Sequence, residues 1–285
     1  MWTLLVMAHL FGLTAYTLLL RKKTSSQSNK LFITFLMQIG LFVPSLVYIP
    51  MNKITLLHTP TEWFFLCTGA VLLTGYMVFN VLALAKLDAS IFTVLFNLRI
   101  FVITILGYLL LAELPTFTQV IGGLIIFGSI AYLYVHKTIH WKSRSTLLGL
   151  FTMIWFSMHA LLERYNLRFW SPEDYLFFIQ VIGLVLMLPL LFIRKINIRQ
   201  EMRHVRDGTT LLLMVTRAIS AYGYVYALMF GSLAITSYIS SLSVVFIVLS
   251  GIYFLGERTH VRKKLLAAAI ACVGLTLILY GKLIV

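Results

Sequence analysis

The segment that decides the fold is "ALAKLDASIFTVLFNLRIFVITILGYLLLAE", residues 83–113, because it recurs in altered form 144 residues later. Its counterpart is "ALMFGSLAITSYISSLSVVFIVLSGIYFLGE", residues 227–257, and the two align without a gap. Eight aligned positions are identical: Ala83/Ala227, Leu84/Leu228, Ile91/Ile235, Leu98/Leu242, Ile103/Ile247, Gly107/Gly251, Leu111/Leu255 and Glu113/Glu257. The glycine and the terminal glutamate are the informative pairs, because leucine and isoleucine matches are common in an apolar chain. The alignment predicts an internal duplication.

The composition predicts an integral membrane protein. Of 285 residues, 60% are apolar and 11% are charged, and the mean hydropathy is +0.95. A membrane-spanning helix needs about 20 mostly apolar residues. Ten segments meet this requirement: 2–20, 31–49, 62–85, 89–112, 116–135, 147–163, 174–193, 209–229, 233–255 and 265–281. These continuous runs lack the alternation of barrel strands, so we expect an all-α integral membrane protein with ten transmembrane helices and no nucleic-acid partner.

The duplication predicts two five-helix repeats, residues 1–140 and 141–285. The shift of 144 residues also carries the first predicted helix onto the sixth and the third onto the eighth. Because five is odd, the second repeat would cross the membrane in the opposite sense to the first. Many secondary transporters use such an inverted repeat to build a substrate site at the membrane midplane.

The net charge of +14 is unevenly distributed over the loops. The loops after odd-numbered helices hold most of the basic residues: Arg21, Lys22, Lys23, Lys30, Lys86, Lys137, Lys142, Arg144, Arg194, Lys195, Arg199, Arg203, Arg206, Arg258, Arg262, Lys263 and Lys264. The other loops hold Lys53, Arg164 and Arg168. The positive-inside rule therefore places the basic loops in the cytoplasm and both termini outside.

The duplicated architecture, in which the fourth helix of each repeat closes on "LLLAE" (109–113) or "YFLGE" (253–257), resembles the EamA-type drug/metabolite transporters. The resemblance covers nearly the whole chain. It implies a transporter of small metabolites, commonly an exporter, with a central cavity lined mainly by the first, third, fourth, sixth, eighth and ninth predicted helices. The sequence holds no "HExxH" or "GxSxG" motif, and Cys67 and Cys272 suggest no metal site, so we expect neither an enzyme nor a cofactor or metal. The expected location is a bacterial cytoplasmic membrane. Members of this family commonly keep both termini in the cytoplasm, so the orientation is left open between the family pattern and the charge pattern.

Two arginines lie inside predicted spans, Arg99 and Arg217. A charged residue at membrane depth costs about 2.5 to 3.5 kcal/mol on insertion scales and is a functional-site hypothesis by default. Asn97 and its repeat equivalent Ser241 are further candidates for substrate contact. Arg99 lies about 200° around an ideal helix from Asn97, so either both flank the cavity or Arg99 faces a neighbouring helix.

Matched polar stripes give the clearest prediction of a binding site. Arg217, Ser220 and Tyr224 follow one another at i, i+3 and i+7 and share a helix face. The shift of 144 residues places Tyr76 and Asn80 on the equivalent face of the third helix. We therefore expect these five residues to contact substrate.

The first and sixth helices add His9, Trp155 and His159 as candidates. Each histidine either binds a ligand or carries a proton, or it holds two helices together through a hydrogen bond. Glu163, four residues after His159, could pair with it but is expected at the membrane interface.

Two repeated pairs have expected roles outside the binding site. Glu113 and Glu257 are structural or gating residues, or are simply solvated. Gly107 and Gly251 are positions of close packing or hinges.

The expected charge of the interior predicts the substrate class. Two arginines, two histidines and no carboxylate favour an anionic or zwitterionic small molecule, such as an amino or organic acid, because a guanidinium suits carboxylates and phosphates. We expect transport by alternating access. A multidrug or cationic-metabolite exporter and a non-transporting membrane binding protein are the alternatives. Apart from substrate and bilayer, a second copy is a conceivable partner, since the small-residue faces at 121–128 and 267–274 either dimerise or pack internally.

Overall fold

The computed structural model describes residues 2–24, 29–48, 58–111, 116–135, 143–230, 236, 240, 243–256 and 260–283. Every element within those residues is a helix, as expected. The first half contains α1 (Trp2–Thr24), α2 (Lys30–Tyr48), α3 (Pro60–Leu84), α4 (Ala89–Phe96), α5 (Arg99–Leu111) and α6 (Phe117–Val135). The second half contains α7 (Arg144–Asn166), α8 (Pro172–Ile193), α9 (Ile198–Val205), α10 (Gly208–Phe230), α12 (Ser243–Phe254) and α13 (Val261–Leu283).

Six helices in the described part are long and apolar enough to cross a bilayer: α1, α2, α3, α7, α8 and α10. Only 33% to 56% of the most apolar stretch of each is buried inside the protein. Large apolar side chains such as Phe11, Phe64 and Leu211 therefore lie on the outer surface, where they are more than half exposed. Lipid is the surrounding that suits such a surface. The count of ten spans stays a prediction beyond these six helices.

Local sequence signals fix where two of the long helices begin. Thr59 and Glu62 form a capping box at the start of α3, with Pro60 in the first turn. Ser171 caps α8 by accepting a hydrogen bond from the Asp174 amide at 3.1 Å. These caps set the register of α3 and α8, which both contribute side chains to the cavity described below.

The expectation of one continuous helix over 89–112 is wrong. The chain makes a turn at Asn97 and Leu98, between α4 and α5. There the Leu98 amide bonds the Leu95 carbonyl and the Ile100 amide bonds the Asn97 carbonyl, three residues back in each case. This tightening changes the rotation of the helix. Irregular backbone at membrane depth is tolerated where it lines a cavity.

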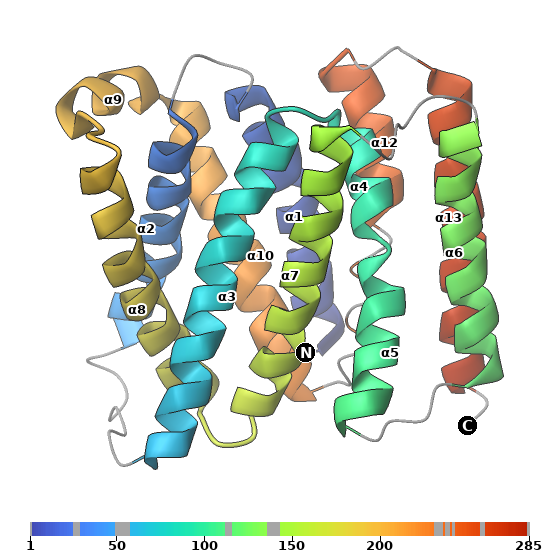
Figure 1. Cartoon of the computed structure of the whole chain (residues 1–285), viewed down its shortest axis with the longest axis horizontal. Coiled ribbons are helices and arrows are strands. Elements are labelled where there is room, and N and C mark those ends of the chain that lie inside the picture. Colours follow the sequence, from blue (N-terminus) through green and yellow to red (C-terminus); the bar gives the residue numbers. More distant parts are fainter. Residues whose placement is uncertain are drawn as a thin grey trace.

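The first helix of each half packs against the third helix of the other half. These pairs are α1 with α10 and α3 with α7, while α6 and α13 form a separate pair at one side (Figure 1). Figure 1 also shows that α3 and α10 run in opposite directions. The chain ends labelled N and C both lie toward the edge opposite α9.

One polar contact occurs in both halves. The Arg21 Nη1 donates to the Leu84 carbonyl at 2.6 Å, and the Arg164 Nη1 donates to the Leu228 carbonyl at 2.8 Å. Leu84 and Leu228 are 144 residues apart, and they lie in the last turns of α3 and α10. Because α3 and α10 run in opposite directions, the same contact is made at opposite edges of the protein.

Candidate functional site

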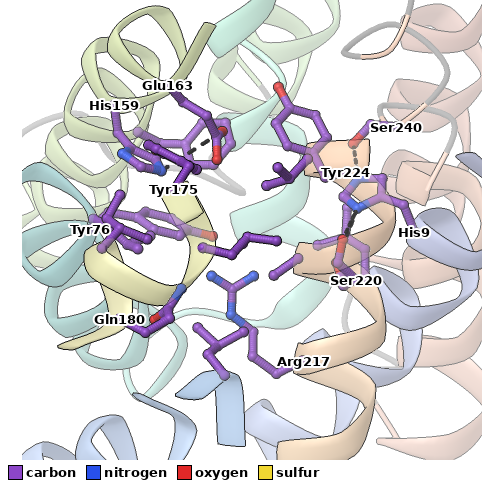
Figure 2. A pocket seen from close by; sticks show the side chains of 18 of the residues that line it. His9, Tyr76, His159, Glu163, Tyr175, Gln180, Arg217, Ser220, Tyr224 and Ser240 are labelled. Carbon is purple, nitrogen blue, oxygen red and sulfur yellow. Dashed lines mark hydrogen bonds and ion pairs between the residues drawn. The ribbon is translucent and has the colours of Figure 1, made fainter. Parts of the chain in front are cut away.

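A cavity lies between the two halves, lined by α1, α2, α3, α5, α7, α8 and α10 together with Ser240 (Figure 2). Its polar lining consists of His9, Tyr76, Arg99, His159, Glu163, Tyr175, Gln180, Arg217, Ser220, Tyr224 and Ser240. Apolar side chains such as Leu73, Phe156 and Ile179 complete the wall. An apolar wall with a few convergent polar groups is typical of a small-molecule site.

Arg217 reaches toward the middle of this cavity from α10 (Figure 2). Its side chain is 7% exposed, and its guanidinium carbon lies 5.1 Å from the centre of the Tyr16 ring and 6.0 Å from that of Tyr76. Among the described residues no carboxylate lies within ion-pair distance of it, and its buried Nε has no hydrogen-bond partner. Cation–π contacts stabilise the charge only in part, so the guanidinium is available to an anionic ligand.

Arg99 is the first residue of α5 and belongs to a chain of hydrogen bonds across the two halves. Its Nη2 donates to the Ser240 Oγ at 3.0 Å, and that hydroxyl lies 2.8 Å from the His9 Nε2. The His9 Nδ1 lies 2.7 Å from the Ser220 carbonyl, which can only accept. The network therefore assigns the proton to Nδ1, with Nε2 accepting from Ser240. Both nitrogens of His9 are engaged in holding α1, α10 and residue 240 together.

Another part of the cavity wall carries a buried carboxylate, Glu163. Glu163 is 5% exposed, its Oε2 lies 3.9 Å from the His159 Nε2, and the Tyr175 hydroxyl lies beside it (Figure 2). The expectation that the interior holds no carboxylate is wrong, because Glu163 is buried on the cavity wall. Because α7 continues to Asn166, Glu163 stays on the helix face that carries His159. The cavity thus holds two guanidiniums and one carboxylate.

A second cavity adjoins the first and shares Leu13, Tyr76 and Arg99 with it. Its other polar lining is uncharged: Tyr16, Thr17, Asn80, Thr93, Asn97 and Ser243. The Asn80 amide donates to the Tyr16 hydroxyl. Asn97 and Arg99 both reach this cavity because the turn between α4 and α5 rotates one relative to the other. The structure therefore favours the alternative in which both flank a cavity.

The structure brings most of the predicted residues together. His9, His159, Ser220, Arg217 and Tyr224 line the first cavity, Asn80 and Asn97 line the second, and Tyr76 and Arg99 line both. Ser241, Glu113 and Glu257 lie outside the described residues. Gly107 and Gly251 lie within α5 and α12, neither of which is interrupted there.

Trp155 lies elsewhere and lines neither cavity. Its ring packs against Phe79 and Phe151, with centroids 5.4 Å apart in both cases, and fills the space above Gly75 of α3. Phe156, the next residue, takes the place on the cavity wall. The structure therefore places Trp155 outside both cavities, and its substrate contact stays a prediction.

Two residues of α8 were not expected at the site, Tyr175 and Gln180. The Gln180 Oε1 accepts a hydrogen bond from the Gln38 Nε2 at 2.7 Å, which links α8 to α2 across the halves. The signal was present in the sequence, since each glutamine is a lone amide in the middle of an otherwise apolar run.

The fold and the cavity define a multi-pass membrane protein with a polar site between two related halves. The sequence model of the EamA-like transporter family matches the chain twice, over residues 1–135 and 143–280. The chain belongs to this family of the drug/metabolite transporter superfamily, whose members are transporters rather than enzymes. A solved structure titled "Crystal structure of protein" has the same fold, with a TM-score of 0.69 at 16% identity over 97% of this chain and 95% of that one. No curated protein matches the sequence.

Proposed function

We propose that the protein is a secondary transporter that exports a small anionic or zwitterionic metabolite, such as an amino or organic acid. The observation that carries the proposal is the Arg217 guanidinium, which reaches the cavity without an ion-pair partner among the described residues. A carboxylate or phosphate would satisfy it through paired hydrogen bonds. Tyr76, Tyr224 and Phe156 offer ring surface to the organic body of the substrate.

Alternating access is the mechanism we infer for this site. The proposed ten helices form two inverted five-helix repeats that rock about the cavity between them. The opposite directions of α3 and α10, and the Arg21 and Arg164 contacts at opposite edges, support the inversion. The edge that carries the basic residues of the loops after odd-numbered helices is called the basic edge below. By the positive-inside rule it would face the cytoplasm.

Export of a cationic compound is the second candidate function, and Glu163 favours it. A buried carboxylate on the cavity wall could pair with an organic cation. Two guanidiniums share the cavity with this single carboxylate, so the balance of charge still favours an anion.

A thermal-shift screen of the purified protein in detergent tests the proposal, because a ligand that binds the folded state stabilises it. The ligands are amino acids, organic acids, phosphorylated metabolites, nucleosides and organic cations. An anion or zwitterion should raise the melting temperature of the native protein and of Arg262→Ala, which loses an exposed charge at the basic edge. Arg217→Ala should lose this response and should not accumulate the ligand in proteoliposomes. Stabilisation by cations alone, or an unchanged response in Arg217→Ala, would overturn the proposed substrate class.

A further inference from the structure

The short helix α9 combines an exposed apolar stripe with a group of bases. Ile198, Met202 and Val205 follow at i, i+4 and i+7 and share one face. Val205 is 3% exposed and packs with Phe32 and Leu36 of α2. Ile198 and Met202 remain 41% and 43% exposed. The apolar face of α9 is therefore only partly covered by the protein.

The bases around α9 are not neutralised by the acids beside them. Five exposed cationic side chains lie within thirteen residues of sequence: Arg194, Lys195, Arg199, Arg203 and Arg206. None of them forms an ion pair within the described residues.

Glu201 of α9 and Asp207, which follows the last of these bases, are both bonded to groups elsewhere in the protein. The Glu201 Oε2 accepts a hydrogen bond from the Asn29 amide at 3.0 Å. The Asp207 carboxylate lies 2.9 Å from the Lys23 ammonium and also accepts from Thr210. The positive charge of the segment is thus left facing outward.

The position of α9 identifies what could cover this surface. It begins a few residues after α8, a membrane-spanning helix whose last residues, Phe192 and Ile193, are 70% and 72% exposed. Figure 1 shows α9 at the edge of the protein, beyond the ends of α2 and α8. The exposed apolar surface of α8 therefore continues onto α9 at the level where the bilayer meets water.

We propose that α9 is a binding site for the headgroups of anionic phospholipids in the surrounding bilayer. Ile198 and Met202 would insert at the boundary of the acyl chains, and Arg199, Arg203 and Arg206 would contact the lipid phosphates. Guanidinium groups suit phosphate oxygens through paired hydrogen bonds. This inference concerns a surface apart from the cavity and does not rest on the proposed substrate.

The proposed lipid site is connected through the chain to the Lys23–Asp207 ion pair, which joins the two halves. Because α9 packs on α2 and leads through Asp207 into α10, a lipid that orders α9 also orders the Lys23–Asp207 ion pair. Anionic lipid should therefore stabilise the whole protein rather than α9 alone.

The test uses the full chain in uncharged detergent, titrated with phosphatidylglycerol and, separately, with phosphatidylcholine, with the melting temperature as readout. Phosphatidylglycerol should stabilise the native protein at a lower concentration than phosphatidylcholine. The double variant R199Q/R203Q should need roughly 30-fold more phosphatidylglycerol, because each base near an anionic lipid surface contributes about fivefold. The control R262Q/K263Q removes the same charge from the same edge and should respond like the native protein.

Three results would overturn the proposal. Equal stabilisation by both lipids would show that the anionic headgroup is not recognised. Equal losses in the two double variants would show an unspecific effect of net charge. Full stabilisation by inorganic phosphate without lipid would assign a site for the free ion. A nitroxide on Met202→Cys gives an independent measurement, since in vesicles it should be more accessible to oxygen than to a water-soluble nickel complex.

Discussion

The close approach of α1 and α10 makes Gly223 the most informative position for a single substitution. A Cβ atom at Gly223 would lie 2.9 Å from the Leu5 carbonyl oxygen and 3.0 Å from the His9 amide nitrogen. Ordinary contacts begin at 3.4 Å, and both neighbours are backbone atoms that cannot rotate away. Gly12, on α1, faces the Ser220 amide nitrogen in the same way at 2.8 Å. Alanine at either position must push the two helices apart.

The expected loss follows from two opposing effects. Overpacking of a tight interior contact costs typically about 1 to 3 kcal/mol. Replacing a helical glycine by alanine recovers about 0.5 to 1 kcal/mol through helix propensity. We therefore expect Gly223→Ala to lower the free energy of unfolding by about 1 to 2 kcal/mol. Separation of the helices should also lengthen the hydrogen bond of 2.7 Å from His9 to the Ser220 carbonyl and weaken ligand binding in the cavity.

The measurement is denaturation of the purified protein in detergent, with Gly128→Ala as the matched control. A Cβ atom at Gly128 of α6 would meet no atom within 4 Å. This control should be as stable as the native protein, or more stable by about 0.5 to 1 kcal/mol. If Gly223→Ala is as stable as the native protein, or if Gly128→Ala loses as much stability, the close approach of α1 and α10 does not determine the stability of the fold.

Three further predictions address the charge of the cavity, the basic edge and the orientation. Glu163→Gln removes the one carboxylate that we find on the cavity wall and should tighten binding of an anionic ligand roughly tenfold in a thermal-shift titration; weaker binding would mean that Glu163 contacts the ligand directly. Burial raises the pKa of Asp207, but the Lys23 ammonium and Thr210 outweigh this and lower it to about 2. The Lys23–Asp207 contact should therefore be complete above about pH 4 and lost as the pH falls toward about 2. Amide exchange at the start of α10 should become faster over this pH range. Asp207→Asn should abolish this pH dependence. In a variant without native cysteines, Arg194→Cys should react with a membrane-impermeant maleimide only from the cytoplasmic side; labelling from outside would refute the charge-based orientation.

The sequence predicted the helical segments and their duplication well, because continuous apolar runs and a constant shift depend on local composition. It did not predict the turn at Asn97 and Leu98. Both residues are compatible with a helix, so no local sequence signal marks the turn. The rotation of Arg99 relative to Asn97 could not be obtained from ideal helical geometry for the same reason.

The polar stripes of α3 and α10 predicted part of the lining of the two cavities, because side chains on one helix face share a neighbour. Trp155 lies outside both cavities because its ring occupies the space left by Gly75 on another helix, a pairing that spacing within one helix cannot reveal. Glu163 was not expected on the cavity wall because it lies near the end of an apolar run, but α7 continues to Asn166 and keeps it on the face of His159. Tyr175 and Gln180 were missed because α8 was not expected to line the cavity.

The described contacts separate into those within one half and those between halves, and this division bears on how the halves could move. The bonds from Arg21 to the Leu84 carbonyl and from Arg164 to the Leu228 carbonyl each join two helices of the same half. In the proposed rocking motion, such bonds would persist while each half moves as a rigid body. They join the first and third helices of each half near one end.

The contacts between halves differ in kind at the two edges. At the basic edge, the Lys264 ammonium, which is 1% exposed, lies 2.8 Å from Asp88, and Lys23 lies 2.9 Å from Asp207. At the opposite edge, Trp170 stacks on His58 with ring centres 3.6 Å apart. Separation at the basic edge breaks ion pairs whose charges water then solvates, and salt screens that attraction. Separation at the other edge exposes the rings of Trp170 and His58 to water. Added salt does not make the exposure of such ring surface more favourable. If the halves rock as proposed, ionic strength should ease opening at the basic edge and not at the edge of Trp170 and His58. The two proposed access states would then respond differently to the same change of salt concentration.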